Sequence, residues 1–125
     1  MLGDKDAQAT IGVRDLNVSR PFYEEVLGLK PLPSSEPSVM GFQAGQAQVL
    51  VYESEYAGTN KSTVLTWSLG ESFDEAVRLL QSKNVAFEHY DLPGMTREGD
   101  IHTAGPMKVV WFKDPDGKIL SLGNY

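Results

Sequence analysis

One supersecondary pattern occurs twice in this sequence, and the second copy follows the first at an offset of 56 residues, from Gln8–Gly28 to Val64–Asn84. Each copy begins with a segment in which apolar and polar residues alternate. Each then continues into an amphipathic stretch that ends at a residue suited to a left-handed helix cap. Alternation is typical of a half-buried strand, and the amphipathic stretch is typical of a helix. The repeat therefore predicts a chain built as strand, helix and strands, twice over.

Local signals give the boundaries of the first copy. A strand is expected over 8–14, and a helix is expected between Asp15 and the cap at Gly28. A proline-rich passage follows. Two strands, at 39–42 and 49–53, then flank a predicted turn at 44–46.

The second copy has the same layout. After a strand at 62–69, the residues Ser72-Phe-Asp-Glu75 match a capping box, and Asn84 is expected to end the helix. A short strand at 85–90 and a long loop at 92–106 come next. Two closing strands, at 108–113 and 118–123, are joined by the turn Asp114-Pro-Asp-Gly117.

Composition narrows the classes of partner. The chain has 125 residues, no cysteine, and 11 Lys and Arg against 17 Asp and Glu, for a net charge of −6. This acidic balance argues against a nucleic-acid or anionic-membrane partner, because both need a basic surface. No apolar run approaches the roughly 18 residues of a membrane span, and the N-terminus has no apolar signal region. We expect a cytoplasmic protein.

Two segments resemble the vicinal oxygen chelate superfamily, which includes glyoxalases, bleomycin-resistance proteins and extradiol dioxygenases. Residues 13–29, VRDLNVSRPFYEEVLGL, are similar to its strand–helix opening, and residues 111–122, WFKDPDGKILSL, are similar to its closing hairpin. With the repeat, the resemblance covers essentially the whole chain. It implies an α+β fold in a single domain, 1–125. Two βαβββ modules, at about 7–57 and 61–125, would form a curved mixed sheet around a cavity.

In most members of this superfamily the cavity holds a metal ion. The resemblance places the metal-ligand positions at Gln8, Val51, Val64 and Ser121. Valine has no donor atom, and Gln and Ser are weak neutral ligands, whereas a catalytic zinc takes three imidazole, carboxylate or thiolate ligands. A shift by two residues, to Glu53 or Thr66, does not supply a histidine. We therefore expect no metal cofactor.

A small organic ligand is the expected partner. One face of the strands should line the cavity while the other, which includes Trp67, packs the helices, and one of Trp111 and Phe112 should face the cavity. The expected lining residues are Gln8, Thr10, Val64, Thr66, Ser68, Trp111 and Ser121. Arg97, in the long loop, either clamps an anionic ligand or is a solvated surface residue.

Catalytic candidates are few. His102, near Asp100 in the long loop, is either a general acid/base or an exposed residue of a mobile lid. Glu53 is either a lone base at the cavity rim or a solvated carboxylate. His89 is expected at a strand edge.

These residues predict metal-free binding or sequestration of a small molecule, as in bleomycin-resistance proteins. One alternative is a metal-dependent glyoxalase-like lyase or dioxygenase, with Glu53, His102 and Gln8 converging. Another is a metal-free isomerase or lyase that uses Glu53 or His102 as its base. The resemblance also implies a homodimer. Aromatic and apolar residues are available for its interface: Phe42, Val49, Val51, Tyr52 and Tyr56.

Overall fold

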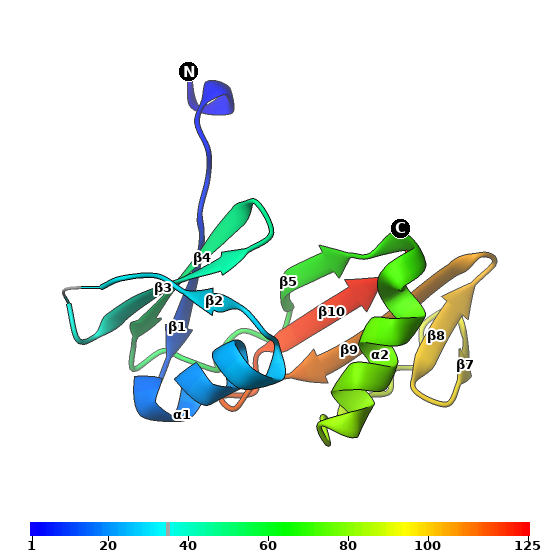
Figure 1. Cartoon of the computed structure of the whole chain (residues 1–125). Coiled ribbons are helices and arrows are strands. Elements are labelled where there is room, and N and C mark those ends of the chain that lie inside the picture. Colours follow the sequence, from blue (N-terminus) through cyan, green and yellow to red (C-terminus); the bar gives the residue numbers. More distant parts are fainter. Residues whose placement is uncertain (35) are drawn as a thin grey trace. The chain divides into compact units, whose positions relative to one another are not determined.

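The computed structural model describes residues 1–34 and 36–125 (Figure 1). The chain divides into two compact units, Met1–Asn60 and Lys61–Tyr125. None of the helices among the described residues is long and apolar enough to cross a membrane.

The first unit is a four-stranded mixed sheet with a short helical segment. A 3₁₀ turn at Leu2–Asp4 precedes the sheet. The elements are β1 (Ala9–Val13), α1 (Leu16–Pro21), a π-helical turn (Phe22–Val26), β2 (Lys30–Pro31), β3 (Val39–Ala44) and β4 (Ala47–Glu53). The strand order is β1-β4-β3-β2, with β1 parallel to β4 and the other neighbours antiparallel.

The second unit repeats this plan with additions. Its elements are β5 (Thr63–Ser68), a 3₁₀ turn (Gly70–Ser72), α2 (Phe73–Ser82), β6 (Phe87–Glu88), β7 (Thr96–Glu98), β8 (Ile101–Ala104), β9 (Met107–Lys113) and β10 (Ile119–Gly123). The strand order is β5-β10-β9-β8-β7, and β6 also pairs with β9. Figure 1 shows α2 lying along one face of this sheet.

The internal repeat is visible in the topology. The order β1-β4-β3-β2 corresponds to β5-β10-β9-β8, and in each unit the first strand pairs in parallel with the last. Gly28 and Asn84, at equivalent positions after the two helices, both adopt positive φ, 74° and 63°. Asn tolerates this left-handed region better than most residues with a side chain. The predicted α+β fold with two βαβββ modules is confirmed, and β6 and β7 are additions to the second module.

The prediction of a long loop at 92–106 is wrong, because this segment contains the hairpin of β7 and β8. All three residues of β7, Thr96, Arg97 and Glu98, are exposed. A short, charged edge strand has no hydrophobic alternation to reveal it in a sequence, and such strands are common at sheet edges because they resist unwanted pairing.

Both predicted helices differ in detail from the structure. The first changes from α to π geometry after Pro21, whose nitrogen has no hydrogen to donate to the preceding turn. Ser72 does not form the expected capping box, since its side chain makes no cap hydrogen bond. Its backbone, at φ −80° and ψ −1°, is already helical, whereas a capping side chain needs an extended residue.

Each unit has its own hydrophobic core. In the first unit the core includes Phe42, Val49 and Val51, three of the five residues expected at a dimer interface. They are almost completely buried within the chain and therefore cannot form such an interface. Only Tyr52 and Tyr56 of that set are exposed.

Candidate functional site

Three neighbouring strands of the second sheet bring polar and aromatic side chains into one row. The register places Thr66 of β5 opposite Ser121 of β10, and Ser121 opposite Trp111 of β9. Residues directly opposite each other in adjacent strands point to the same face. The hydroxyl oxygens of Thr66 and Ser121 lie 2.7 Å apart and share a hydrogen bond.

This row lies on the face of the sheet opposite α2. Side chains alternate along a strand. Lys108 of β9 reaches Asp74 of α2, at 3.7 Å, so Phe112, which points to the same side as Lys108, and its neighbours Leu120 and Leu122 are buried on the α2 side. Trp67, opposite Leu122, shares that side, as expected. We call the other side the helix-free face of the second sheet. It consists of Val64, Thr66, Ser68, Val109, Trp111 and Ser121.

Trp111 and Phe112 therefore have different roles. Phe112 is fully buried and its ring contacts the ring of Phe87 edge-on, at a centroid distance of 6.0 Å. Trp111 is half-buried on the helix-free face. Of the two aromatic residues, Trp111 is thus the one available to a ligand.

An aromatic cluster surrounds Trp111. The ring of His102 lies edge-on to it at a centroid distance of 4.8 Å, and the ring of Tyr90 lies edge-on at 5.3 Å. His102 and Tyr90 are also in contact, with centroids 6.2 Å apart. Tyr90 is not among the site residues predicted from the sequence. The signal that could have found it is its spacing, because it lies two residues after Glu88, which pairs with Trp111 in the sheet.

His102 is not an exposed lid residue, because it lies in β8 and only 1% of its surface is accessible. Its Nε2 accepts a hydrogen bond of 3.0 Å from the backbone N–H of Tyr90. Its Nδ1 is buried and has no hydrogen-bond partner among the described residues. The expectation of an exposed His102 is wrong because the sequence does not reveal the β7–β8 hairpin that buries it.

The charges beside this cluster are largely paired. Glu88 forms an ion pair of 3.2 Å with Lys113. Partial burial raises the pKa of the Tyr90 phenol and the negative charge of Glu88 raises it further, while Lys113 acts in the opposite direction. The Tyr90 hydroxyl therefore keeps its proton to a higher pH than an exposed tyrosine.

Arg97 lies on β7 directly opposite His102. It is exposed, and its Nη1 donates a hydrogen bond of 2.7 Å to the carbonyl of Gly99. In the turn between β7 and β8, Asp100 accepts hydrogen bonds from His89, at 2.7 Å, and from Gln81 of α2, at 3.0 Å. The bond from His89 is the main reason why the pKa of Asp100 is lowered.

In the first unit, Gln8 and Thr10 are exposed at the start of the first sheet. The Gln8 amide nitrogen donates a hydrogen bond of 3.3 Å to the side chain of Gln48. Gln8 and Gln48, together with Gln46, line an open depression of about 790 Å³.

Val51, which the resemblance places at a metal-ligand position, and Glu53, the residue two positions further on, both have structural roles in the first unit. Val51 pairs with Ile11 and is fully buried in the core of the first unit. Glu53, two residues along the same strand, accepts a hydrogen bond of 3.1 Å from the backbone N–H of Leu16. Its carboxylate thus caps α1 beside Asp15, whose side chain accepts from Asn17 at 2.9 Å.

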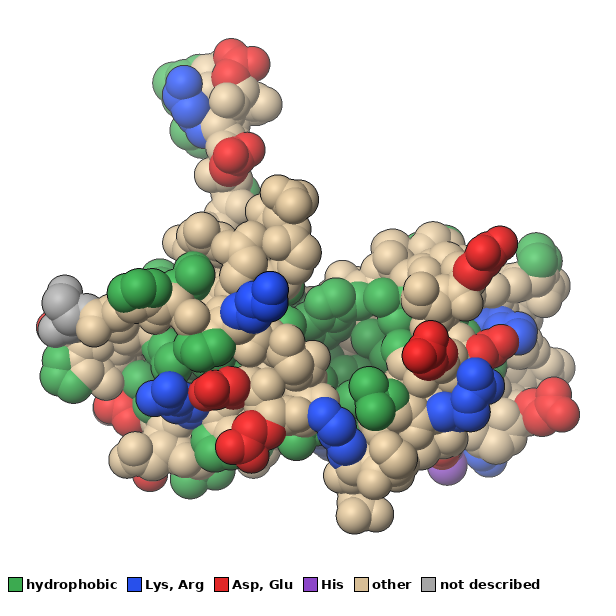
Figure 2. Space-filling view, viewed as in Figure 1, with side chains coloured by type: hydrophobic (Ala, Val, Ile, Leu, Met, Phe, Trp, Pro, Cys, Tyr) green, Lys and Arg blue, Asp and Glu red, His purple; other side chains and the backbone are tan. Residues whose placement is uncertain are grey.

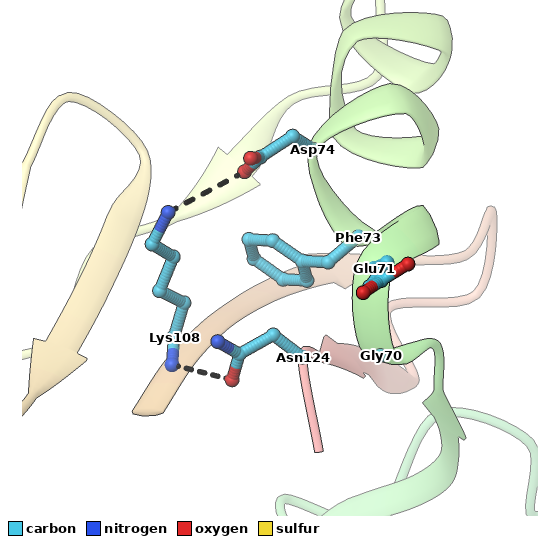
Figure 3. Close-up of a pocket in the computed structure, with 6 residues that line it drawn as sticks. All are labelled: Gly70, Glu71, Phe73, Asp74, Lys108 and Asn124. Carbon is cyan, nitrogen blue, oxygen red and sulfur yellow. Dashed lines mark hydrogen bonds and ion pairs between the residues drawn. The ribbon is translucent and has the colours of Figure 1, made fainter. Parts of the chain in front are cut away.

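A pocket of about 300 Å³ lies where α2 begins, beside β9. In Figure 3 the side chains of Asp74 and Lys108 point toward each other beside the ring of Phe73, and Lys108 Nζ lies 3.7 Å from Asp74 Oδ1. The backbone N–H of Lys108 donates to Asn124 at 2.8 Å. Figure 2 shows side chains of both charges spread over the viewed face of each unit rather than gathered by sign.

Comparison with known proteins identifies the family. The sequence profile of the glyoxalase/bleomycin resistance protein/dioxygenase superfamily matches residues 7–122. The chain belongs to this superfamily.

Solved structures of other members of the glyoxalase superfamily share the fold. A lactoylglutathione lyase from Agrobacterium tumefaciens is 15% identical with a TM-score of 0.70, covering 95% of this chain and 92% of its own. The fosfomycin resistance protein FosX from Listeria monocytogenes has the same identity and TM-score, with 95% and 91% covered. A glyoxalase/dioxygenase from Nostoc punctiforme is 20% identical with a TM-score of 0.67, covering 95% and 89%. No curated protein matches the chain.

The residues at the glyoxalase-type metal positions do not fit a divalent cation. The Ser121 hydroxyl is hydrogen-bonded to Thr66, the Gln8 amide is hydrogen-bonded to Gln48, and Val51 and Val64 have no donor atom. Within 1–34 and 36–125, no three His, Cys, Asp or Glu side chains come together as a possible metal site. Zinc takes imidazole, carboxylate or thiolate ligands, and harder cations take several carboxylate or carbonyl oxygens. These four positions offer only the amide of Gln8 and the hydroxyl of Ser121.

Proposed function

We propose that this glyoxalase-superfamily protein binds a small organic molecule on the helix-free face of the second sheet, without a metal ion. The observation that carries the proposal is the half-buried Trp111 ring beside the hydrogen-bonded pair of Thr66 and Ser121. The ring offers a flat apolar contact surface, and the two hydroxyls offer a donor and acceptors beside it. Such a mixture is typical of small-molecule sites.

The surrounding residues support a binding role in the manner of bleomycin-resistance proteins. Val64 and Ser68 flank Thr66 on the same face and are available for contact. Gln8 and Thr10 are exposed on the first sheet, and we propose them as ligand contacts of the first unit taken by itself. The names of two similar structures, a lactoylglutathione lyase and a fosfomycin resistance protein, support a small organic molecule as the ligand class. We also propose a cytoplasmic location, which the lack of cysteine supports.

Tryptophan fluorescence tests this proposal, because the chain has two tryptophans, Trp67 and Trp111, on opposite sides of the sheet. A panel of planar carboxylates, keto acids, glutathione conjugates and antibiotics, including fosfomycin, is titrated into the wild type and into Trp111→Phe and Trp67→Phe. We expect a ligand to change the emission of the wild type and of Trp67→Phe, but not of Trp111→Phe. EDTA should leave its affinity unchanged. Silence across the whole panel, or binding that EDTA abolishes, contradicts the proposal.

A second candidate function is a metal-free isomerase or lyase, and the buried His102 favours it. Of the two predicted bases, Glu53 is committed to the first turn of α1, whereas His102 keeps one ring nitrogen without a partner among the described residues. Compounds that bind are incubated with the protein and followed by NMR. Turnover that His102→Gln abolishes while binding persists would establish an enzyme. Recovery of every bound compound unchanged would leave binding as the function.

A further inference from the structure

We propose that His102, Trp111 and Tyr90 form a ligand subsite in which the Nδ1–H of His102 donates a hydrogen bond to a carbonyl or carboxylate oxygen of a planar organic ligand. The inference rests on the proposed function, because it places the chemistry of the ligand on the same face of the second sheet. It adds to that function the hydrogen-bond donor of the protein, the chemical class of the acceptor on the ligand, and the planar shape of the ligand.

The hydrogen bond from Tyr90 determines the tautomer of His102. A backbone N–H can only donate, so Nε2, at 3.0 Å from the Tyr90 nitrogen, must present its lone pair. A neutral imidazole carries one proton, which in this ring lies on Nδ1. The unpartnered nitrogen of His102 is therefore a donor and not an acceptor.

This donor is buried and requires an acceptor. His102 is 1% exposed, and none of the described residues accepts a hydrogen bond from Nδ1. Buried polar groups are nearly always satisfied by protein, water or ligand, and each exception needs an explanation. A ligand oxygen at Nδ1 would satisfy the donor, and the stabilisation would appear as binding affinity.

The neighbouring rings determine the shape of the ligand. The rings of Trp111 and Tyr90 meet edge-on. Both residues are half-buried, so each ring keeps part of its surface for contact with a ligand. Aromatic rings favour stacked or edge-on contacts with other flat groups. Tyr90 belongs to the segment 89–95, which contains no helix or strand, so its ring can move aside with little loss of backbone pairing.

The local charges favour an anionic or carbonyl ligand over a cationic one. Arg97 faces His102 across the β7–β8 hairpin and is exposed. Of the acids around the cluster, Glu88 pairs with Lys113 and Asp100 accepts from His89 and Gln81, while Asp91 and Glu98 are exposed to solvent. A carboxylate whose oxygen reaches Nδ1 can therefore also be attracted by Arg97.

Two substitutions at His102 separate the donor from the structural acceptor. The amide nitrogen of Asn lies as many bonds from Cα as Nδ1, so His102→Asn keeps a donor in that place and removes the acceptor for Tyr90. The amide oxygen of Gln lies as many bonds from Cα as Nε2, so His102→Gln keeps that acceptor and removes the donor at Nδ1. The probes are benzoate and benzaldehyde, with toluene as a flat control that has no oxygen acceptor. Binding is measured by Trp111 emission in the Trp67→Phe background.

We expect benzoate and benzaldehyde to bind more tightly than toluene. His102→Gln should weaken benzoate binding about tenfold, as expected for a lost hydrogen bond to a charged acceptor, and His102→Asn should weaken it much less. The opposite order overturns the proposal: His102→Asn would weaken benzoate binding more than His102→Gln does, in step with a larger loss of folding stability. If these probes alter Trp111 emission equally in all three proteins, only the subsite fails and the proposed function stands. If no compound of the wider panel binds, both fail.

Nitrogen-15 NMR of the wild-type protein gives a test that does not depend on folded variants. The long-range proton–nitrogen correlations of His102 should show a protonated Nδ1 and an unprotonated Nε2, and benzoate should shift the Nδ1–H resonance downfield. A proton on Nε2, or an Nδ1–H resonance that saturating benzoate leaves unchanged because a buried water already satisfies it, overturns the proposal.

Discussion

The hydroxyl oxygens of Thr66 and Ser121 lie 2.7 Å apart on adjacent parallel strands, 55 positions apart in the sequence. One of the two hydroxyls donates and the other accepts, on a partly buried face of the sheet. In this superfamily, the resemblance places a metal-binding carboxylate at the position of Ser121. In this chain the same position carries a neutral hydroxyl that is hydrogen-bonded to Thr66.

The coupling between these two hydroxyls can be measured. Thr66→Val and Ser121→Ala each remove one hydroxyl, and the double variant removes both. We expect each single variant to lower the free energy of unfolding by about 1 kcal/mol, because each leaves one partner without its hydrogen bond. The double variant should lose less than the sum of the two. Urea unfolding of the four proteins gives the coupling, and strict additivity would mean that the contact contributes nothing.

Metal ions should not stabilise the protein by binding to the helix-free face of the second sheet. We expect zinc, nickel or manganese, added in excess to chelator-treated protein, to leave the thermal midpoint unchanged, because a ligand raises it only by binding the native state. Differential scanning calorimetry with and without EDTA checks this. A midpoint that rises with one metal and falls with EDTA would instead favour a metal-dependent lyase or dioxygenase.

The turn between β9 and β10 contains a buried ion pair that should be a major source of stability. Lys118 Nζ lies 2.7 Å from Asp114 Oδ2, and Asp114 Oδ1 also accepts from the backbone N–H groups of Asp116 and Lys118. Lys118→Met removes the cation but leaves a buried carboxylate, so we expect a loss of about 3 kcal/mol. Lys113→Met, which breaks the more exposed pair with Glu88, is the matched control at about 0.5 kcal/mol or less. Similar losses for the two variants in denaturant unfolding would show that burial adds nothing.

Much of the fold is predictable because local signals agree with each other. The left-handed residues Gly28 and Asn84 and the turn at Asp114–Gly117 are each encoded within a few neighbouring positions. The 56-residue repeat is the recurrence of such local signals in the same order. The resemblance, which places Val64 and Ser121 at corresponding positions of the cavity face, together with alternation along 62–69, also predicts that Thr66 and Ser121 share one face.

The features that cannot be predicted depend on contacts between distant segments. His102 is buried because β8 pairs with β9 and because Tyr90 lies against its ring, and neither contact has a local sequence signal. Glu53 has a capping role only because β4 ends beside the start of α1. The polar hairpin of β7 and β8 lacks the apolar alternation on which strand prediction relies.

The hydrogen bonds to Asp100 should make stability depend on pH. The bond from His89, with a further bond from Gln81, lowers the pKa of Asp100 in the folded protein. A lowered folded pKa means that this stabilisation is present above the unfolded value of about 3.9 and is lost as the pH falls through the lowered folded value. Asp100→Asn should therefore cost about 0.5 kcal/mol at pH 6 and almost nothing near pH 2. Asp91→Asn, a nearby exposed carboxylate, is the control for loss of charge, and a penalty at Asp100 that is equal at both pH values would contradict this expectation.

The edges of the two sheets predict a homodimer. Edge strands are commonly protected by proline or charge, and β2 contains Lys30 and Pro31 while β7 contains Arg97 and Glu98. By contrast, β1 and β5 have neither charge nor proline, and in the pairings of the described residues each has only one neighbour.

We expect a second copy of the chain to cover these unprotected edges, since two-fold closure is the commonest arrangement for soluble assemblies. Thr63→Lys places a charge at the start of β5 and should weaken dimerisation, whereas the matched change Thr96→Lys on the already charged β7 should not. Sedimentation across a range of micromolar concentrations measures both. A mass that stays at one chain for the wild type would mean that β1 and β5 are covered within a single molecule and that the predicted homodimer is wrong.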